Sequence, residues 1–182
     1  MEKTLKTVNY FWRITYSHTI AYFIAGVFAL LVVNYRELYS TDIISSFMRP
    51  VDEPIVALGP FLQIFRGILI ALILLPLRKT FFEEKQGLLK LGLIIAGFSL
   101  LSTIGPTMGS FDGYIYTKIS YLYQLLGYPE AIVYVLLFIG SLYISQKYEG
   151  KKIVTLLSII IMLLISLMSI MGYYDGIKNN VG

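Results

Sequence analysis

The sequence RPVDEPIVALGPFLQIFRGILIALILLPLR, residues 49–78, decides the class of this protein. Residues 55–77 of this stretch are almost entirely apolar and numerous enough to cross a bilayer, which takes about 20 such residues. One arginine, Arg66, interrupts this run near its middle. A charged side chain at the centre of a membrane helix costs roughly 2.5–3.5 kcal/mol, so it usually faces protein or a water-filled cavity and has a partner. We therefore expect Arg66 to face the inside of a helical bundle.

The composition of the whole chain supports the same class. Of its 182 residues, 57% are hydrophobic and only 14% are charged, whereas about 25% of the residues in a typical soluble domain are charged. We interpret residues 1–182 as a single transmembrane helical domain of an integral membrane protein. The chain has no cysteine, which excludes disulfides and thiolate chemistry.

Apolar runs on both sides of the Arg66 stretch predict the other helices. The predicted fold class is an all-α integral membrane protein with a bundle of five transmembrane helices. The fourth helix begins at Pro129, which suits a first turn, and Glu130 beside it complements the helix dipole. The five predicted spans cover about residues 14–34, 55–77, 88–104, 129–146 and 153–174.

The basic residues predict the orientation of these spans. With the N-terminus inside, ten lysines and arginines at the span ends and in the connecting segments face the cytoplasm and four face the other side. The positive-inside rule favours that arrangement. Five spans then place the C-terminus outside, and we expect a multi-pass protein of a cell membrane, most simply a bacterial-type inner membrane.

The first predicted helix carries a seam of small residues and the single histidine of the chain. Ser17, Ala21, Ala25 and Ala29 follow one another at four-residue steps, which suits close contact between helices. His18 stands beside this seam. A lone histidine is a poor metal ligand, so we expect a hydrogen-bonded residue of the bundle, with a role in proton transfer as the alternative.

Two segments predicted to lie on the outer side are unusual in composition. Residues 35–54 form the longest predicted loop and contain six charged residues and two prolines. Residues 105–113, GPTMGSFDG, contain three glycines and a proline, so a regular helix cannot continue well through them. We expect an irregular or re-entrant segment around residues 105–128.

These segments and the Arg66 helix together predict an outward-facing polar pocket. At 3.6 residues per turn, Asp52, Gln63 and Arg66 share one face of that helix. We expect Arg66 and Gln63 at the floor of the pocket, and the other candidates at its rim or in its cover. The rim candidates are Arg49, Asp52 and Glu53, and the cover candidates are Ser110, Asp112, Tyr116, Thr117 and Lys118.

Three functions remain open for such a pocket. Because arginine has a planar set of donors that matches carboxylate or phosphate, the pocket could bind an anionic lipid headgroup or a small anionic solute. Alternatively, Arg66 pairs with Asp112 or Asp52, and the protein is a structural or assembly subunit of a larger membrane complex. The third possibility is an intramembrane enzyme that uses Asp and Glu for acid–base chemistry.

Familiar catalytic and binding motifs are missing from the sequence. It has no phosphate-binding glycine loop with lysine, no HExxH and no GxSxG. We therefore expect no metal and no cofactor, and assign no catalytic residue. The expected partners are the lipid bilayer, an anionic lipid or solute, and either further copies of the chain or a larger membrane complex, but not nucleic acid.

Overall fold

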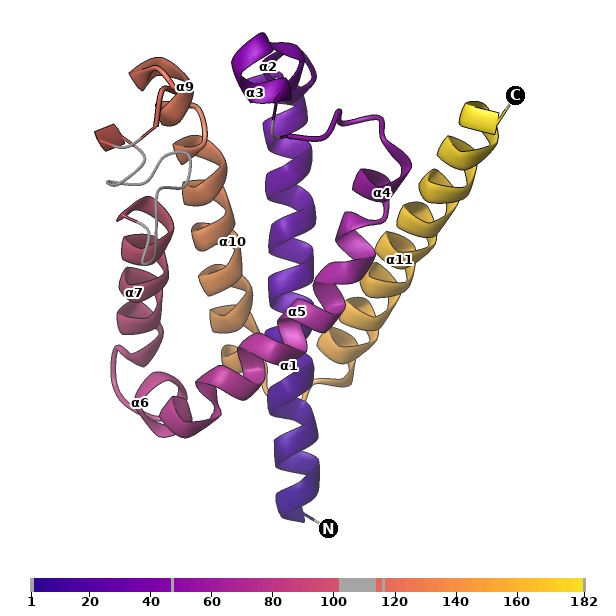
Figure 1. Ribbon diagram of the computed structural model, residues 1–182. Coiled ribbons are helices and arrows are strands. Elements are labelled where there is room, and N and C mark those ends of the chain that lie inside the picture. Colours follow the sequence, from indigo (N-terminus) through magenta and orange to yellow (C-terminus); the bar gives the residue numbers. More distant parts are fainter. Residues whose placement is uncertain (1, 47, 102–113, 116, 182) are drawn as a thin grey trace.

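All secondary structure in the described part of the chain is helical (Figure 1). The computed structural model describes the chain apart from residues 1, 47, 102–113, 116 and 182. Its elements in chain order are α1 (Glu2–Phe28), η1 (Ala29–Val33), α2 (Tyr35–Ser40), α3 (Asp42–Ser45), α4 (Pro54–Ala57), α5 (Gly59–Leu74), η2 (Leu75–Leu77), α6 (Arg78–Phe82), α7 (Gly87–Leu101), α9 (Tyr121–Leu125), α10 (Tyr128–Lys147) and α11 (Lys152–Val181).

Four helical segments are long and apolar enough to cross a membrane, which indicates a multi-pass membrane protein. Large apolar side chains point outward from them: Ile73 on α5 is 72% exposed and Leu163 on α11 is 65% exposed. Such surfaces are stable against lipid chains and costly in water. The four segments are Thr7–Val33, Gly59–Phe82, Tyr121–Lys147 and Lys152–Asn179.

The third predicted span is not confirmed. Helix α7 has 15 residues, which corresponds to about 22 Å at 1.5 Å per residue, whereas the hydrocarbon core of a bilayer is about 30 Å thick. Its apolar part, Gly87–Ser99, falls among the shorter apolar helices. The end of the predicted span, residues 102–104, lies outside the described residues. The structure therefore supports four of the five predicted spans.

Helix α1 lies at the centre of the bundle, where it packs mainly against α5 and α10 (Figure 1). The predicted small-residue seam is confirmed, because Ser17, Ala21, Ala25 and Ala29 are all at most 1% exposed. The hydroxyl of Ser17 is 2.9 Å from that of Ser141 on α10. Small side chains thus let α10 approach the backbone of α1.

The crossing of α1 and α5 is equally close and lies beside Arg66. A Cβ atom added to Gly67 would lie 2.8 Å from the Cα atom of Thr15. No other residue type fits there without a shift of the backbone. The contact brings residue 66 next to the central helix.

Helix α5 is interrupted where the sequence contains Gly59 and Pro60. Helix α4 ends at Ala57 and α5 begins at Gly59. The hydroxyl of Ser169 on α11 fills the break, because it donates to the Ala57 carbonyl at 2.5 Å and accepts from the Phe61 N–H at 3.2 Å. A side chain inserted between these backbone groups satisfies both of them within the bundle.

Three predicted boundaries were wrong. Residues 35–54, expected as a loop, contain α2 and α3, because Asn34 adopts a left-handed conformation (φ 57°) that ends one helix and starts another. Helix α1 begins at Glu2 and not near residue 14, since charged residues mark the membrane edge without ending a helix. Helix α11 continues to Val181, past residue 174, because Gly176 packs against Pro54 and no proline interrupts it.

The two ends of the bundle differ in what they carry. The N-terminus and α6 lie at one end, and α2, α3, α9 and the C-terminus lie at the other (Figure 1). The turn between α10 and α11 lies toward the N-terminal end. These two ends are called the N-terminal end and the C-terminal end below.

Candidate functional site

Arg66 lines a cavity in the bundle, called the Arg66 cavity below. The cavity has a volume of about 190 Å³ and is bounded by residues from α1, α5, α7 and α10. No described acidic side chain lies within ion-pair distance of the guanidinium. The residues that line it are His18, Tyr22, Ala25, Arg66, Ser99, Gly127, Glu130, Ala131 and Tyr134.

His18 is the buried polar centre of this region. It is 1% exposed, and its Nε2 atom lies 3.0 Å from Gln63 Oε1 while its Nδ1 atom lies 2.7 Å from Tyr134 Oη. A carbonyl oxygen only accepts, so Nε2 carries the proton and donates to Gln63. In the neutral imidazole, Nδ1 then accepts from the Tyr134 hydroxyl. His18 thus has the bundle hydrogen bonds expected for it, and it joins α1 to α5 and α10.

Glu130 is the acidic group of the Arg66 cavity. The hydroxyl of Tyr35, from α2, donates a hydrogen bond to Glu130 Oε2. Burial raises the pKa of Tyr35, and the hydrogen bond to Glu130 raises it further. The tyrosine therefore stays protonated and acts as a donor over the whole physiological pH range. One carboxylate oxygen of Glu130 is engaged in this way, which leaves the other able to accept from a ligand.

A second cavity adjoins the first at Glu130. Its volume is about 320 Å³, and it lies between α1, α4, α5 and α11, with Tyr35 and Tyr39 from α2 in its lining. Tyr22 and Glu130 line both cavities. Tyr22 and Glu130 therefore separate the Arg66 cavity from the second, more apolar cavity beside the interrupted α4–α5 segment.

Of the two predicted floor residues, Arg66 lines the cavity and Gln63 does not, and the predicted rim lies elsewhere. Gln63 is one turn before Arg66 on α5 and binds His18. Arg49 pairs with Glu53 in the exposed segment before α4. Asp52 lies 3.7 Å from Arg36, so its described partner is not Arg66. None of these three rim residues lines the Arg66 cavity.

The predicted cover is described only in part. Thr117 accepts a hydrogen bond from Gln124 at 3.4 Å, and Lys118 is exposed. Neither lines the Arg66 cavity. Ser110, Asp112 and Tyr116 lie outside the described residues.

Sequence reasoning did not place four residues in the pocket that the structure brings to Arg66. They are His18, Tyr22, Glu130 and Tyr134. Glu130 carries a signal, because it is an acidic residue at the start of an apolar span, but an acid in that position equally suits the helix dipole. The tyrosines gave no signal, since tyrosine is common near span ends.

Metal chemistry has no visible site in the described part of the chain. No three His, Asp or Glu side chains there are grouped so that they could hold an ion.

Comparison of the chain with protein-family models, with curated proteins and with solved structures finds no match. What the Arg66 cavity can bind follows from the chemistry of its lining residues.

Proposed function

We propose that this multi-pass membrane protein binds a small anionic solute or an anionic lipid headgroup in the Arg66 cavity. One observation carries the proposal. The guanidinium lies in the middle of an apolar helix, beside a cavity of about 190 Å³, and no described carboxylate pairs with it. A cation in that position is strongly stabilised by an anion that enters the cavity.

The chemistry of the lining narrows the ligand class. Arginine binds carboxylate or phosphate through two parallel hydrogen bonds, and a partly dehydrated site strengthens them. Glu130 faces the same cavity and repels a second negative charge. The ligand that fits best has an anionic group for Arg66 and an N–H or O–H donor for Glu130. A phosphoethanolamine group has both.

The volume of the cavity sets the size of the bound group. An apolar cavity of about 150 Å³ holds one benzene molecule, so about 190 Å³ holds a solute or headgroup of similar size. A whole lipid does not fit. For a lipid ligand, only the headgroup enters, and the acyl chains remain outside.

The membrane arrangement that we propose has five crossings, with the N-terminus in the cytoplasm and the Arg66 cavity opening to the outer side. Two observations support it. The termini lie at opposite ends of the bundle (Figure 1), which an odd number of crossings requires. Gly127 and Glu130 line the Arg66 cavity and lie at the start of α10, toward the C-terminal end.

Ligand-induced thermal stabilisation of the purified full-length protein tests the proposal. The probes are phosphoethanolamine, as a soluble ligand, and lysophosphatidylethanolamine, which distinguishes a lipid source. We expect either probe to raise the unfolding temperature of the wild type and of Lys79→Ala, but not of Arg66→Ala. Lys79 is exposed and remote from the cavity.

Two results would overturn the proposal. One is an equal response of Arg66→Ala and Lys79→Ala to the probes, which would place binding elsewhere. The other is loss of folding of Arg66→Ala in the absence of any probe. That loss would show an internal pairing of Arg66 and favour the structural or assembly function.

A further inference from the structure

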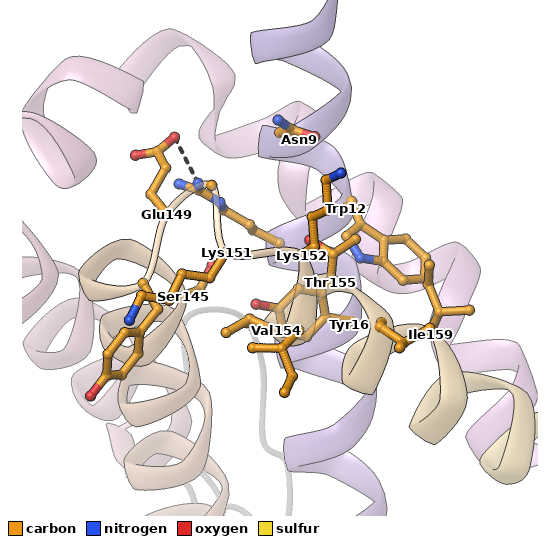
Figure 2. A pocket seen from close by; sticks show the side chains of 15 residues that line it. Asn9, Trp12, Tyr16, Ser145, Glu149, Lys151, Lys152, Val154, Thr155 and Ile159 are labelled. Atoms are coloured by element: carbon orange, nitrogen blue, oxygen red, sulfur yellow. Dashed lines mark ion pairs between the residues drawn. The ribbon is translucent and has the colours of Figure 1, made fainter.

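A large cavity of the described structure lies apart from Arg66. It has a volume of about 700 Å³ and lies between α1, the end of α10 and the start of α11, toward the N-terminal end (Figure 2). It is called the basic cavity below. Nothing in the proposed function uses it.

The charges that line this cavity are mainly positive. Arg13, Lys151 and Lys152 supply three cations against one carboxylate, that of Glu149. Figure 2 shows Lys151 on the short turn that leads into α11 and Lys152 at the start of α11, with Trp12 and Tyr16 on the neighbouring α1. The start of α11 adds the positive end of a helix dipole beside the lysines.

The two lysines are not neutralised by nearby acids. Arg13 pairs with Glu149 at 2.7 Å, so the only carboxylate of the lining is engaged. Lys151 lies 4.9 Å from the ring centroid of Tyr148, and no described ion pair includes Lys152. Both lysines are exposed. Two positive charges are therefore available to an anion.

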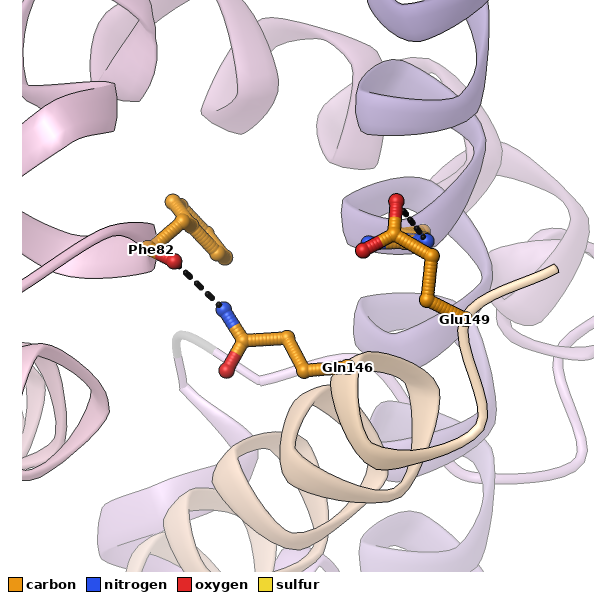
Figure 3. A network of polar contacts seen from close by, with 4 residues as sticks. Phe82, Gln146 and Glu149 are labelled. Atoms are coloured by element: carbon orange, nitrogen blue, oxygen red, sulfur yellow. Dashed lines mark hydrogen bonds and ion pairs between the residues drawn. The ribbon is translucent and has the colours of Figure 1, made fainter.

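The walls of the basic cavity are held in place by polar contacts. Figure 3 shows the Arg13–Glu149 pair and a hydrogen bond from Gln146 to the carbonyl of Phe82, at 3.2 Å, beside the same turn. Trp12 Nε1 donates to Ser158 Oγ on α11 at 3.0 Å. These contacts join α1 to α11 and to the turn after α10, and they join α10 to α6, so the elements around the cavity are held together without a ligand.

The floor of the cavity continues into a lipid-facing surface. Leu156 and Ile159 line it and are 57% and 40% exposed. Trp12 and Tyr16 lie beside them, and such rings prefer the headgroup region of a membrane. The end of one span, Lys147, and the start of the next, Lys152, place the cavity at that depth. A ligand with a phosphate and an apolar tail matches both the lysines and the apolar floor of the cavity.

We infer that the basic cavity binds an anionic phospholipid, with its phosphate at Lys151 and Lys152 and its glycerol and first acyl carbons over Trp12 and Ile159. Basic pockets between membrane helices are suited to such headgroups, and a lysine near the surface strengthens binding of an anionic lipid about fivefold. With the proposed orientation, the site faces the cytoplasmic leaflet. The inference does not depend on the ligand of the Arg66 cavity.

Native mass spectrometry of the full-length protein in detergent tests this inference. The probes are phosphatidylglycerol, phosphatidylcholine and soluble glycerol 3-phosphate. We expect the wild type to retain phosphatidylglycerol at least tenfold more strongly than the other two. In the variant Lys151→Gln/Lys152→Gln this retention should fall about tenfold or more, and Lys151→Arg/Lys152→Arg should keep it.

The matched control is Lys79→Gln/Lys85→Gln, which removes the same charge at the same end of the bundle without touching the cavity. It should retain the lipid like the wild type. Equal loss in the control would show general surface attraction and overturn the inference. Equal retention of phosphatidylcholine, or of glycerol 3-phosphate, would overturn it without any variant.

Discussion

Gln63 on α5 accepts a hydrogen bond from His18 on α1, with 3.0 Å between Oε1 and Nε2. This contact fixes the rotation of α5 at the level of the cavity. Arg66 is three residues further along the same helix, so it faces the same side as Gln63. The hydrogen bond therefore determines where the mid-span charge points.

Replacing Gln63 by leucine should destabilise the fold. The substitution leaves the buried His18 N–H without an acceptor, which costs about 1–3 kcal/mol. Trp12 fluorescence during thermal unfolding measures the effect. The double variant His18→Phe/Gln63→Leu should lose less than the sum of the two single variants, because no partner is then left unsatisfied. Strictly additive losses would contradict the role of this bond.

Replacing Gly67 by alanine should open the contact between α1 and α5. The new methyl group would lie 2.8 Å from Thr15 Cα, and overpacking of this kind costs about 1–3 kcal/mol. Gly140→Ala is the control, because nothing lies within 4 Å of its Cβ position. It should leave stability unchanged or raise it, as expected for glycine in a helix. Equal unfolding temperatures of the two variants would refute the close crossing.

Replacing Ser169 by alanine should weaken the junction of α4 and α5. It removes the hydroxyl that bonds both the Ala57 carbonyl and the Phe61 N–H, and we expect a loss of about 1–3 kcal/mol. Ser166→Ala is matched in chemistry and in helix, but its hydroxyl bonds only the Met162 carbonyl of α11 itself. Denaturation in the same detergent should therefore show a much smaller change for Ser166→Ala.

Replacing Tyr35 by phenylalanine should lower the unfolding temperature through loss of the bond to Glu130, and the loss should have a defined pH dependence. Because burial raises the pKa of Tyr35 above its ordinary value of 10.0, its contribution is complete below about pH 10 and is lost only as pH rises through the folded pKa. The gap between wild type and variant should thus be constant from pH 7 to 9.

The control for that experiment is Tyr143→Phe, whose side chain is 57% exposed. It should unfold like the wild type at every pH. A gap between wild type and Tyr35→Phe that shrinks already between pH 7 and 9 would contradict the raised pKa.

Local sequence signals predict where the helices lie better than they predict which residues of different helices contact one another. Pro129 and Lys147 mark the ends of α10 to within a residue, because proline suits a first turn and a basic residue suits the membrane edge. The seam of Ser17, Ala21, Ala25 and Ala29 predicted a buried face of α1. These features depend only on neighbours in the chain, so they can be read from the sequence.

The lining of the Arg66 cavity depends on contacts between helices, which periodicity does not reveal. The helical repeat predicts that Gln63 and Arg66 share one face. It does not predict that His18 and Tyr134 lie opposite them. The sequence predicts Arg49, Asp52 and Glu53 as ligand-binding residues at the rim of the pocket. In the structure, Arg49 and Glu53 pair with each other before α4, and Asp52 lies 3.7 Å from Arg36 on α2.

Accessibility of position 66 tests the central claim that Arg66 lines a cavity open to the outer side. Since the chain has no cysteine, Arg66→Cys and Phe65→Cys each carry a single thiol. Phe65 is 57% exposed on the lipid-facing side of α5 and lines neither cavity at Glu130. Intact cells would be treated with a membrane-impermeant, charged methanethiosulfonate reagent. We expect labelling of Arg66→Cys, slowed by phosphoethanolamine, and none of Phe65→Cys; equal labelling of both, or none of Arg66→Cys, would contradict the claim.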